Sequence, residues 1–170
     1  MAPEINKSTQ IVCLVLKFIV QSYLFVPPYL RGMIYSPEIR FSDIDSYGIV
    51  HNTKFLIYFE QSRIALFNNI AGHWDWRKSG VLVANQEINY KVPVTIQDKL
   101  EILVWIETVG TKSMTYAYEA YKKIGEDKIL AATAKTVLVS FDVRSGKSIE
   151  VPKEWREMID KNNLLGKPSV

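Results

Sequence analysis

Residues 53–70 contain neither glycine nor proline, and the start of this run, Phe55-Leu56-Ile57-Tyr58-Phe59, is apolar on nearly every side. The run predicts one long helix, with Asn52 as its N-cap and Gly72 at its end. A surface helix carries a single apolar stripe, so a helix that is apolar on most sides is expected to be enclosed. The rest of the chain must therefore supply a layer that covers this helix.

The sequence after the helix alternates between apolar and polar residues, as β-strands do. Strands are expected around residues 88–92, 100–106, 114–118 and 129–141, with a short strand at 34–41 before the helix. A turn at 144–147 leads to a short hairpin partner at 149–151, and Pro152 suits the first turn of a terminal helix at 153–161. The fold class predicted is α+β, an antiparallel sheet wrapped around one long central helix. A sheet of this kind leaves edge strands that commonly pair between subunits, so a homo-oligomer is expected.

The first 32 residues differ from the rest of the chain, because residues 11–30 are its most apolar run. Lys17 splits that run and Pro27-Pro28 would stop a helix, so it falls short of a membrane span of roughly 20 apolar residues. We interpret residues 1–32 as an N-terminal extension outside the domain, and residues 33–170 as a single domain that begins at Met33. The alternative is an amphipathic anchor that contacts a membrane.

The composition excludes several function classes. One cysteine and two histidines cannot form a disulfide framework or a structural zinc site, so neither a metal nor a cofactor is expected, and a reducing, cytoplasmic location is predicted. The net charge is +3, and much of it lies in residues 1–32, so the domain itself lacks the basic excess typical of nucleic-acid-binding proteins.

Common catalytic motifs are also missing. Gly146-Lys147-Ser148 resembles the tail of a phosphate-binding loop, but Phe141 stands where that motif needs glycine, and a hairpin turn is the better interpretation. The chain has neither a serine-hydrolase elbow nor a dinucleotide-binding fingerprint. Glu60 and Arg63 are spaced to form an ion pair on the helix, which favours a structural pair over catalysis.

The most informative segment is residues 41–52, which contains Asp43, Asp45, Gly48 and the predicted helix start at Asn52. A helix N-terminus presents unpaired N–H groups that can polarise a carbonyl oxygen, and a nearby carboxylate can attack the carbonyl or activate water. The combination suits carbonyl hydrolysis. From spacing alone the two aspartates could equally be turn formers without a chemical role.

Several motifs occur here in the order seen in one family: Asp43-x-Asp45-x-x-Gly48-Ile49-Val50, then Tyr58-Phe59-Glu60-x-x-Arg63, Tyr90-Lys91-x-Pro93 and the turn Arg144-Ser145-Gly146. In these motifs the chain resembles the hotdog-fold acyl-CoA thioesterases of the 4-hydroxybenzoyl-CoA thioesterase type, especially their Tol-Pal-associated bacterial branch. The resemblance covers Met33 to about Ile159. It implies a hotdog fold whose active sites form between two protomers, often within tetramers.

The resemblance also implies roles for individual residues. Asp45 would be the catalytic carboxylate, as nucleophile or as general base, and the backbone N–H of Asn52 would stabilise the oxyanion. Gly48 would let the loop turn tightly between them. The branch commonly has a histidine where Asn52 stands; here His51 precedes Asn52, so His51 is a further candidate for contact with substrate or water.

Coenzyme A recognition is implied for Lys112 and Ser113, at a strand start where these enzymes often hold pantetheine or phosphate. The expected activity is hydrolysis of acyl thioesters of coenzyme A or acyl carrier protein, without a cofactor. Two alternatives remain: a non-catalytic module that binds acyl thioesters or proteins, and a hotdog dehydratase that acts on hydroxyacyl thioesters.

Overall fold

The computed structural model describes residues 32–71 and 74–168. The predicted N-terminal extension, except Gly32, and the predicted helix end at Gly72 lie outside the described residues. Within the described ranges, no helix is both long enough and apolar enough to cross a membrane.

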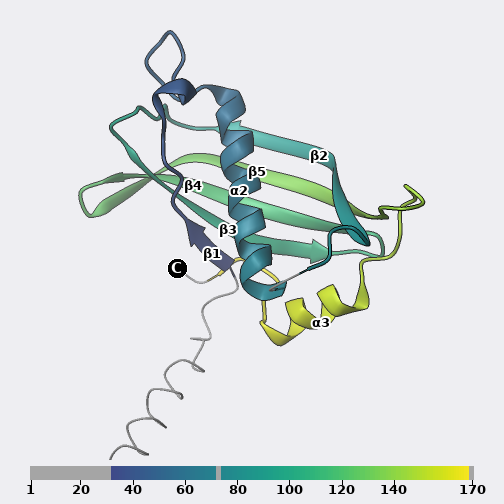
Figure 1. The fold of residues 1–170 in the computed structure, drawn as a ribbon. Coiled ribbons are helices and arrows are strands. Elements are labelled where there is room, and N and C mark those ends of the chain that lie inside the picture. The colour runs from purple at the N-terminus through teal and green to yellow at the C-terminus, as the bar shows by residue number, and fades with distance from the viewer. Residues whose placement is uncertain (1–31, 72–73, 169–170) are drawn as a thin grey trace, which may run out of the picture.

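The described chain folds into one antiparallel sheet with a long helix across one of its faces (Figure 1). The strands lie in the order β1-β3-β4-β5-β2, with bounds β1 Gly32–Tyr35, β2 Ser79–Tyr90, β3 Lys99–Val109, β4 Ser113–Ile124 and β5 Asp127–Asp142. The long helix is α2 (Asn52–Ala71), preceded by a short 3-10 turn, η1 (Phe41–Asp43). The terminal helix α3 (Lys153–Lys161) lies near the C-terminal end of α2 (Figure 1). The predicted α+β arrangement is confirmed, and β1 and β2 are its edge strands.

Helix α2 buries one face against the sheet. Its buried residues recur every three or four positions: Phe55, Tyr58, Phe59, Ser62, Arg63, Leu66 and Phe67. Phe59 is fully buried, and its ring lies 4.8 Å from that of Tyr118 on β4. The opposite face is open, with Ile57 and Ile64 each 46% exposed. The expectation of an enclosed helix was therefore wrong for the single chain, because the sheet covers the helix from one side only.

Three strands differ from the prediction. Strand β2 begins at Ser79, nine residues before the segment expected at 88–92, and ends at Tyr90. The first strand ends at Tyr35, and the following residues lack strand structure; Pro37 has no N–H to donate to a neighbouring strand. The expected hairpin partner at 149–151 is reduced to a single bridge between Phe141 and Ser148, because Val151 donates its N–H to Thr111 instead. Helix α3 has the predicted bounds.

Candidate active site

A small hairpin-like loop precedes α2 and projects beyond the N-terminal end of the helix (Figure 1). An antiparallel bridge between Ile44 and Val50 closes the loop, and the Val50 N–H donates to the Val94 carbonyl at 2.7 Å. A further bridge joins Ile49 to Thr95 in the segment between β2 and β3. These contacts attach the loop, which carries Asp45 and Gly48, to the sheet end from which α2 starts.

The carboxylate of Asp45 holds the loop through one of its two oxygens. Oδ1 accepts hydrogen bonds from the backbone N–H groups of Tyr47 at 2.8 Å and Ile49 at 3.4 Å. Oδ2 has no hydrogen-bond or ion-pair partner among the described residues. Asp45 is half-buried, so the loop fixes the carboxylate while leaving one oxygen available to a substrate or a water molecule.

Gly48 gives the loop its turn. Its backbone φ is +77°, in the region that residues with a Cβ rarely adopt, and its N–H donates to the Asp45 carbonyl at 3.0 Å. A Cβ at this position would meet no atom within 4 Å, so the requirement for glycine comes from the backbone conformation and not from crowding.

Replacing Gly48 with alanine is expected to cost about 1 kcal/mol of stability, because alanine is strained at positive φ, and to lower hydrolysis by moving Asp45. Gly125 is a matched control, since its φ is +61°, it also has open space for a Cβ, and it lies in the turn between β4 and β5. Urea unfolding and thiol release should be measured for both variants. Equal activity in the two alanine variants would contradict a role for the Gly48 turn in positioning Asp45.

The start of α2 differs from the prediction. Asn52 is the first helical residue and not the N-cap, and His51 takes the capping place. The His51 ring Nδ1 accepts the Thr53 N–H at 3.2 Å and lies 2.8 Å from the Thr53 hydroxyl, while the His51 N–H donates to the Asp43 carbonyl. A histidine nitrogen can accept this hydrogen bond as well as an asparagine oxygen would, and residue spacing alone does not separate the two arrangements.

The backbone N–H of Asn52 has no acceptor among the described residues. The first N–H groups of a helix lack partners within the helix and lie at the positive end of its dipole. The carbonyl of the same residue, Asn52, accepts a hydrogen bond from the Tyr90 hydroxyl at 2.9 Å. The helix start is therefore fixed by Tyr90, His51 and Asp43, and it presents an unpaired amide that can polarise a carbonyl oxygen.

Asp43 is the residue at this site whose importance the sequence analysis missed. Its side chain is buried, and its carboxylate accepts hydrogen bonds from the Tyr58 hydroxyl at 2.7 Å and the Arg40 N–H at 3.1 Å. Lys54 Nζ lies 3.1 Å from the other carboxylate oxygen. Burial alone would raise the pKa of Asp43, but these hydrogen bonds and the lysine charge outweigh it and hold the pKa below its usual value. Asp43 thus ties η1 and the loop to α2.

The lowered pKa predicts an acid-dependent contribution of Asp43 to stability. A carboxyl group whose pKa is lower in the folded state stabilises the fold above its unfolded pKa, and this contribution is lost as the pH falls through the folded pKa. The difference in unfolding free energy between the wild type and Asp43→Asn should therefore be large near neutral pH and shrink in acid. Urea unfolding at several pH values measures it, and a difference that grows in acid would contradict the prediction.

Lys112 and Ser113 lie at the other end of the sheet. Helix α2 starts beside the C-terminal end of β2, whereas Lys112 and Ser113 stand at the start of β4, which is paired with the far end of β5. Lys112 Nζ is exposed, 3.5 Å from the Ser148 carbonyl. Within one chain, the structure thus brings Asp45, Gly48, His51 and Asn52 together but not Lys112 and Ser113.

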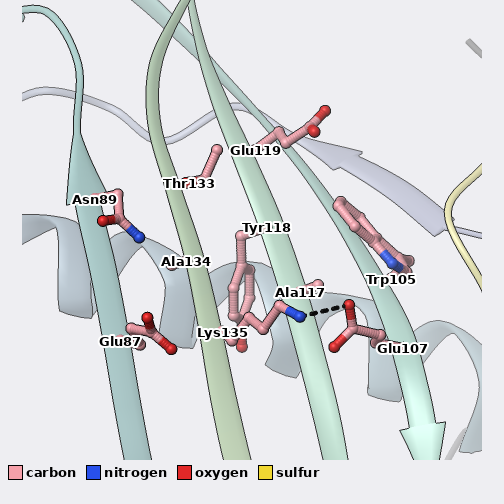
Figure 2. Close-up of a pocket in the computed structure, with 10 residues that line it drawn as sticks. All are labelled: Glu87, Asn89, Trp105, Glu107, Ala117, Tyr118, Glu119, Thr133, Ala134 and Lys135. Carbon is pink, nitrogen blue, oxygen red and sulfur yellow. Dashed lines mark ion pairs between the residues drawn. The ribbon is translucent and has the colours of Figure 1, made fainter.

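The structure has two hollows of interest, and they differ in how close they lie to the group formed by Asp45, Gly48, His51 and Asn52. A cleft of about 430 Å³ lies between η1 and α2, and its polar lining includes Arg40, Asp43 and Lys54. A hollow of about 190 Å³ lies on the opposite face of the sheet, where Trp105 and the ion pair between Lys135 and Glu107 face away from α2 (Figure 2). Only the cleft adjoins the loop that carries Asp45. Within the described residues, no group of three or more His, Cys, Asp or Glu side chains is arranged to hold a metal ion.

Comparisons with known proteins agree with this fold. The profile of the thioesterase-like superfamily matches residues 39–159. Relatives include the putative acyl-CoA thioesterase YneP of Bacillus subtilis, 29% identical over 73% of this chain and 92% of its own length. The uncharacterized protein YsmA of Bacillus subtilis is 30% identical over 72% of this chain and 81% of its own length.

Solved structures show the same fold. A 4-hydroxybenzoyl-CoA thioesterase variant in complex with 4-hydroxybenzoyl-CoA superposes with a TM-score of 0.70 at 21% identity, over 76% of this chain and 99% of that one. A thioesterase superfamily member from Jannaschia gives a TM-score of 0.70 at 19% identity, over 79% and 95% of the two chains. The expected hotdog fold is confirmed. The chain therefore belongs to the thioesterase-like superfamily.

Proposed function

We propose that this protein hydrolyses acyl-CoA thioesters, with Asp45 as the catalytic carboxylate and the Asn52 N–H as the oxyanion donor. The observation that carries the proposal is that a short, closed loop with an available carboxylate oxygen on Asp45 leads directly into a helix start with an unpaired amide at Asn52. Family membership and the name of the relative YneP support the acyl-CoA substrate class. Thioesters of acyl carrier protein present the same reacting bond and are the alternative substrate.

The reaction needs only groups present at this site and water. As general base, Asp45 takes a proton from water while the water oxygen bonds to the thioester carbon. The Asn52 N–H stabilises the negative charge that develops on the carbonyl oxygen. The carbon–sulfur bond then breaks, and the leaving sulfur takes up the proton. As nucleophile, Asp45 would instead form an anhydride that water hydrolyses. His51 lies at the same helix start, where its ring would contact substrate or water.

We place the complete site between two copies of the chain. Strand β2 is an edge strand with exposed apolar side chains, Leu82 at 56% and Val83 at 49%, and an unpaired edge of this kind favours pairing with a second copy. Antiparallel pairing of two β2 strands brings the sheet end that carries Lys112 and Ser113 in one copy beside the start of α2 in the other copy. Lys112 and Ser113 of one copy would then bind the phosphate or pantetheine portion of a substrate held by the other copy.

The test is thiol release from short, long and aromatic acyl-CoA thioesters, including 4-hydroxybenzoyl-CoA and 1,4-dihydroxy-2-naphthoyl-CoA. Steady release of free thiol is expected for at least one class. Binding without release for every thioester, including carrier-protein thioesters, would overturn the proposal and favour a binding module. Conversion of a 3-hydroxyacyl thioester without free thiol would instead indicate a dehydratase. Sedimentation of the protein tests the dimer, and we predict a cytoplasmic location, which fractionation of cells tests.

A further inference from the structure

The turn that joins β3 to β4 is held on one side by an arginine of α3. Nη2 of Arg156 donates hydrogen bonds to the carbonyl oxygens of Gly110 and Thr111, the second at 3.0 Å. Nε of the same side chain donates to the Val151 carbonyl at 3.4 Å, just before α3 begins. One guanidinium therefore ties two successive peptide units of the turn to the start of the terminal helix.

Two backbone hydrogen bonds fix the same turn. The Val151 N–H donates to the Thr111 carbonyl at 2.9 Å, and the Ser140 N–H donates to the Lys112 carbonyl at 2.9 Å. Together with Arg156, these groups occupy the carbonyl oxygens of all three residues from position 110 to position 112. The acceptors of the turn are thus used by β5 and by the segment that follows it.

The donors of the turn are free. The N–H groups of Thr111 and Lys112 have no acceptor among the described residues. They belong to the two peptide units whose carbonyls bind Arg156, and in a trans peptide the N–H points away from the carbonyl. Both N–H groups therefore face away from Arg156. A hydrogen bond from a cation to a carbonyl also strengthens the N–H of the same peptide unit as a donor.

The turn also carries the two residues assigned above to coenzyme A. Lys112 is exposed, and Ser113 is half-buried at the start of β4. Lys112 Nζ lies 3.5 Å from the Ser148 carbonyl, and a second exposed lysine, Lys147, directly precedes Ser148 in the chain. Successive backbone N–H groups close to lysine side chains form an arrangement suited to a phosphate group.

We propose that Arg156 is a positioning residue for coenzyme A, which holds the turn so that the N–H groups of Thr111 and Lys112 bind a phosphate of the substrate. Arg156 acts through the two carbonyls behind the turn and not by contact with the phosphate. The inference rests on the proposed function, because it takes the ligand to be the coenzyme A portion of the thioester. It assigns the turn to phosphate recognition and not to the acyl group.

The test compares Arg156→Gln with the wild type on an acyl-CoA and on the matching acyl thioester of pantetheine, which has no phosphate. We expect KM for the acyl-CoA to rise about tenfold with kcat unchanged, and KM for the pantetheine thioester to stay the same. The dissociation constant of free coenzyme A, measured by calorimetry on the full chain, should rise by the same factor. Lys153→Gln is the control, because it also removes a positive charge from α3, and Lys153 pairs with Glu157 and not with the turn. Its constants should match those of the wild type.

Arg156→Lys separates positioning from charge. Lysine keeps the positive charge but lacks the Nε donor to the Val151 carbonyl and the rigid fork of the guanidinium. The dissociation constant of coenzyme A should therefore remain raised in this variant. Wild-type binding by Arg156→Lys would indicate direct attraction between the charge and the phosphate, and would overturn the positioning role.

Thr111→Pro tests the turn with Arg156 in place. Proline removes the Thr111 N–H, retains the carbonyl that Arg156 binds, and is favoured at the second position of a four-residue turn. We expect weaker coenzyme A binding by Thr111→Pro and wild-type binding by Thr111→Ala, which keeps the N–H. Equal affinities in these two variants would refute phosphate binding by this N–H. Urea unfolding verifies that each variant is folded.

Unchanged coenzyme A binding in folded Arg156→Gln would overturn the inference. An equal rise of KM for the acyl-CoA and the pantetheine thioester would do the same, because it would indicate a structural role alone. These outcomes are separate from those of the proposed function, since binding of coenzyme A does not require hydrolysis. A protein that binds coenzyme A through this turn but releases no thiol would retain the inference and refute the hydrolysis. A protein that hydrolyses carrier-protein thioesters but does not bind coenzyme A would refute the inference and retain thioester hydrolysis.

Discussion

Asp45→Asn is expected to lower kcat for thiol release by about 10²- to 10⁴-fold, the usual contribution of a carboxylate that acts as a base or nucleophile. Asparagine has nearly the same shape, and its amide oxygen can still accept the N–H groups of Tyr47 and Ile49 that the Asp45 carboxylate now accepts. The loop should therefore keep its conformation while losing the negative charge and the basic oxygen. The measurement is kcat for the best acyl-CoA in the panel, with circular dichroism and urea unfolding to verify the fold.

Asp142→Asn provides a matched control for this variant. Asp142 also accepts a backbone N–H with its Oδ1, from Ser145 at 2.7 Å, but its turn follows β5 at the other end of the sheet. Both substitutions remove one charge from a turn-forming aspartate, and only the one at Asp45 should lower kcat to this extent. Near-wild-type hydrolysis by Asp45→Asn would contradict a catalytic role. Asp45 would then be only a turn former, which is the alternative that residue spacing alone left open.

The elements that the sequence predicted well are those determined by local patterns. Helix α3 has the predicted bounds, and α2 differs from its prediction only at its ends, because apolar periodicity and a proline at the helix start act over a few residues. Because such patterns are local, they also explain why the N-cap was predicted at Asn52 and not at His51. Both His51 and Asn52 have side chains that can cap a helix, and the choice depends on the bond between the His51 N–H and the Asp43 carbonyl.

Features that depend on distant residues could not be predicted in this way. The role of Asp43 requires Tyr58, fifteen positions later, to direct its hydroxyl at the carboxylate across the turn that separates η1 from α2. The separation of Lys112 from Asn52 follows from the direction and register in which β2 and β4 pair with β5, which alternation of apolar residues does not specify. The open side of α2, marked by Ile57 and Ile64, likewise depends on which layer covers the helix and not on the helix sequence.

Asn52→Pro is expected to lower kcat by about 10²- to 10³-fold, the usual cost of removing one oxyanion donor. Proline lacks the N–H that we assign to the oxyanion, and the first helical position is the one place in a helix where proline is well tolerated. The Asn52 carbonyl that accepts the Tyr90 hydroxyl is retained in the variant. The substitution should therefore remove the catalytic amide while the helix and its contact with β2 persist.

Asn52→Ala separates the backbone from the side chain, because it removes the amide side chain and keeps the N–H. The kcat of Asn52→Ala should stay close to that of the wild type. Because the amide acts mainly in the transition state, KM should change little in both Asn52→Ala and Asn52→Pro. Urea unfolding of both variants verifies that the helix start has formed. Full activity in a folded Asn52→Pro variant would exclude the Asn52 amide as the oxyanion donor, and loss of activity in Asn52→Ala alone would assign the role to the side chain.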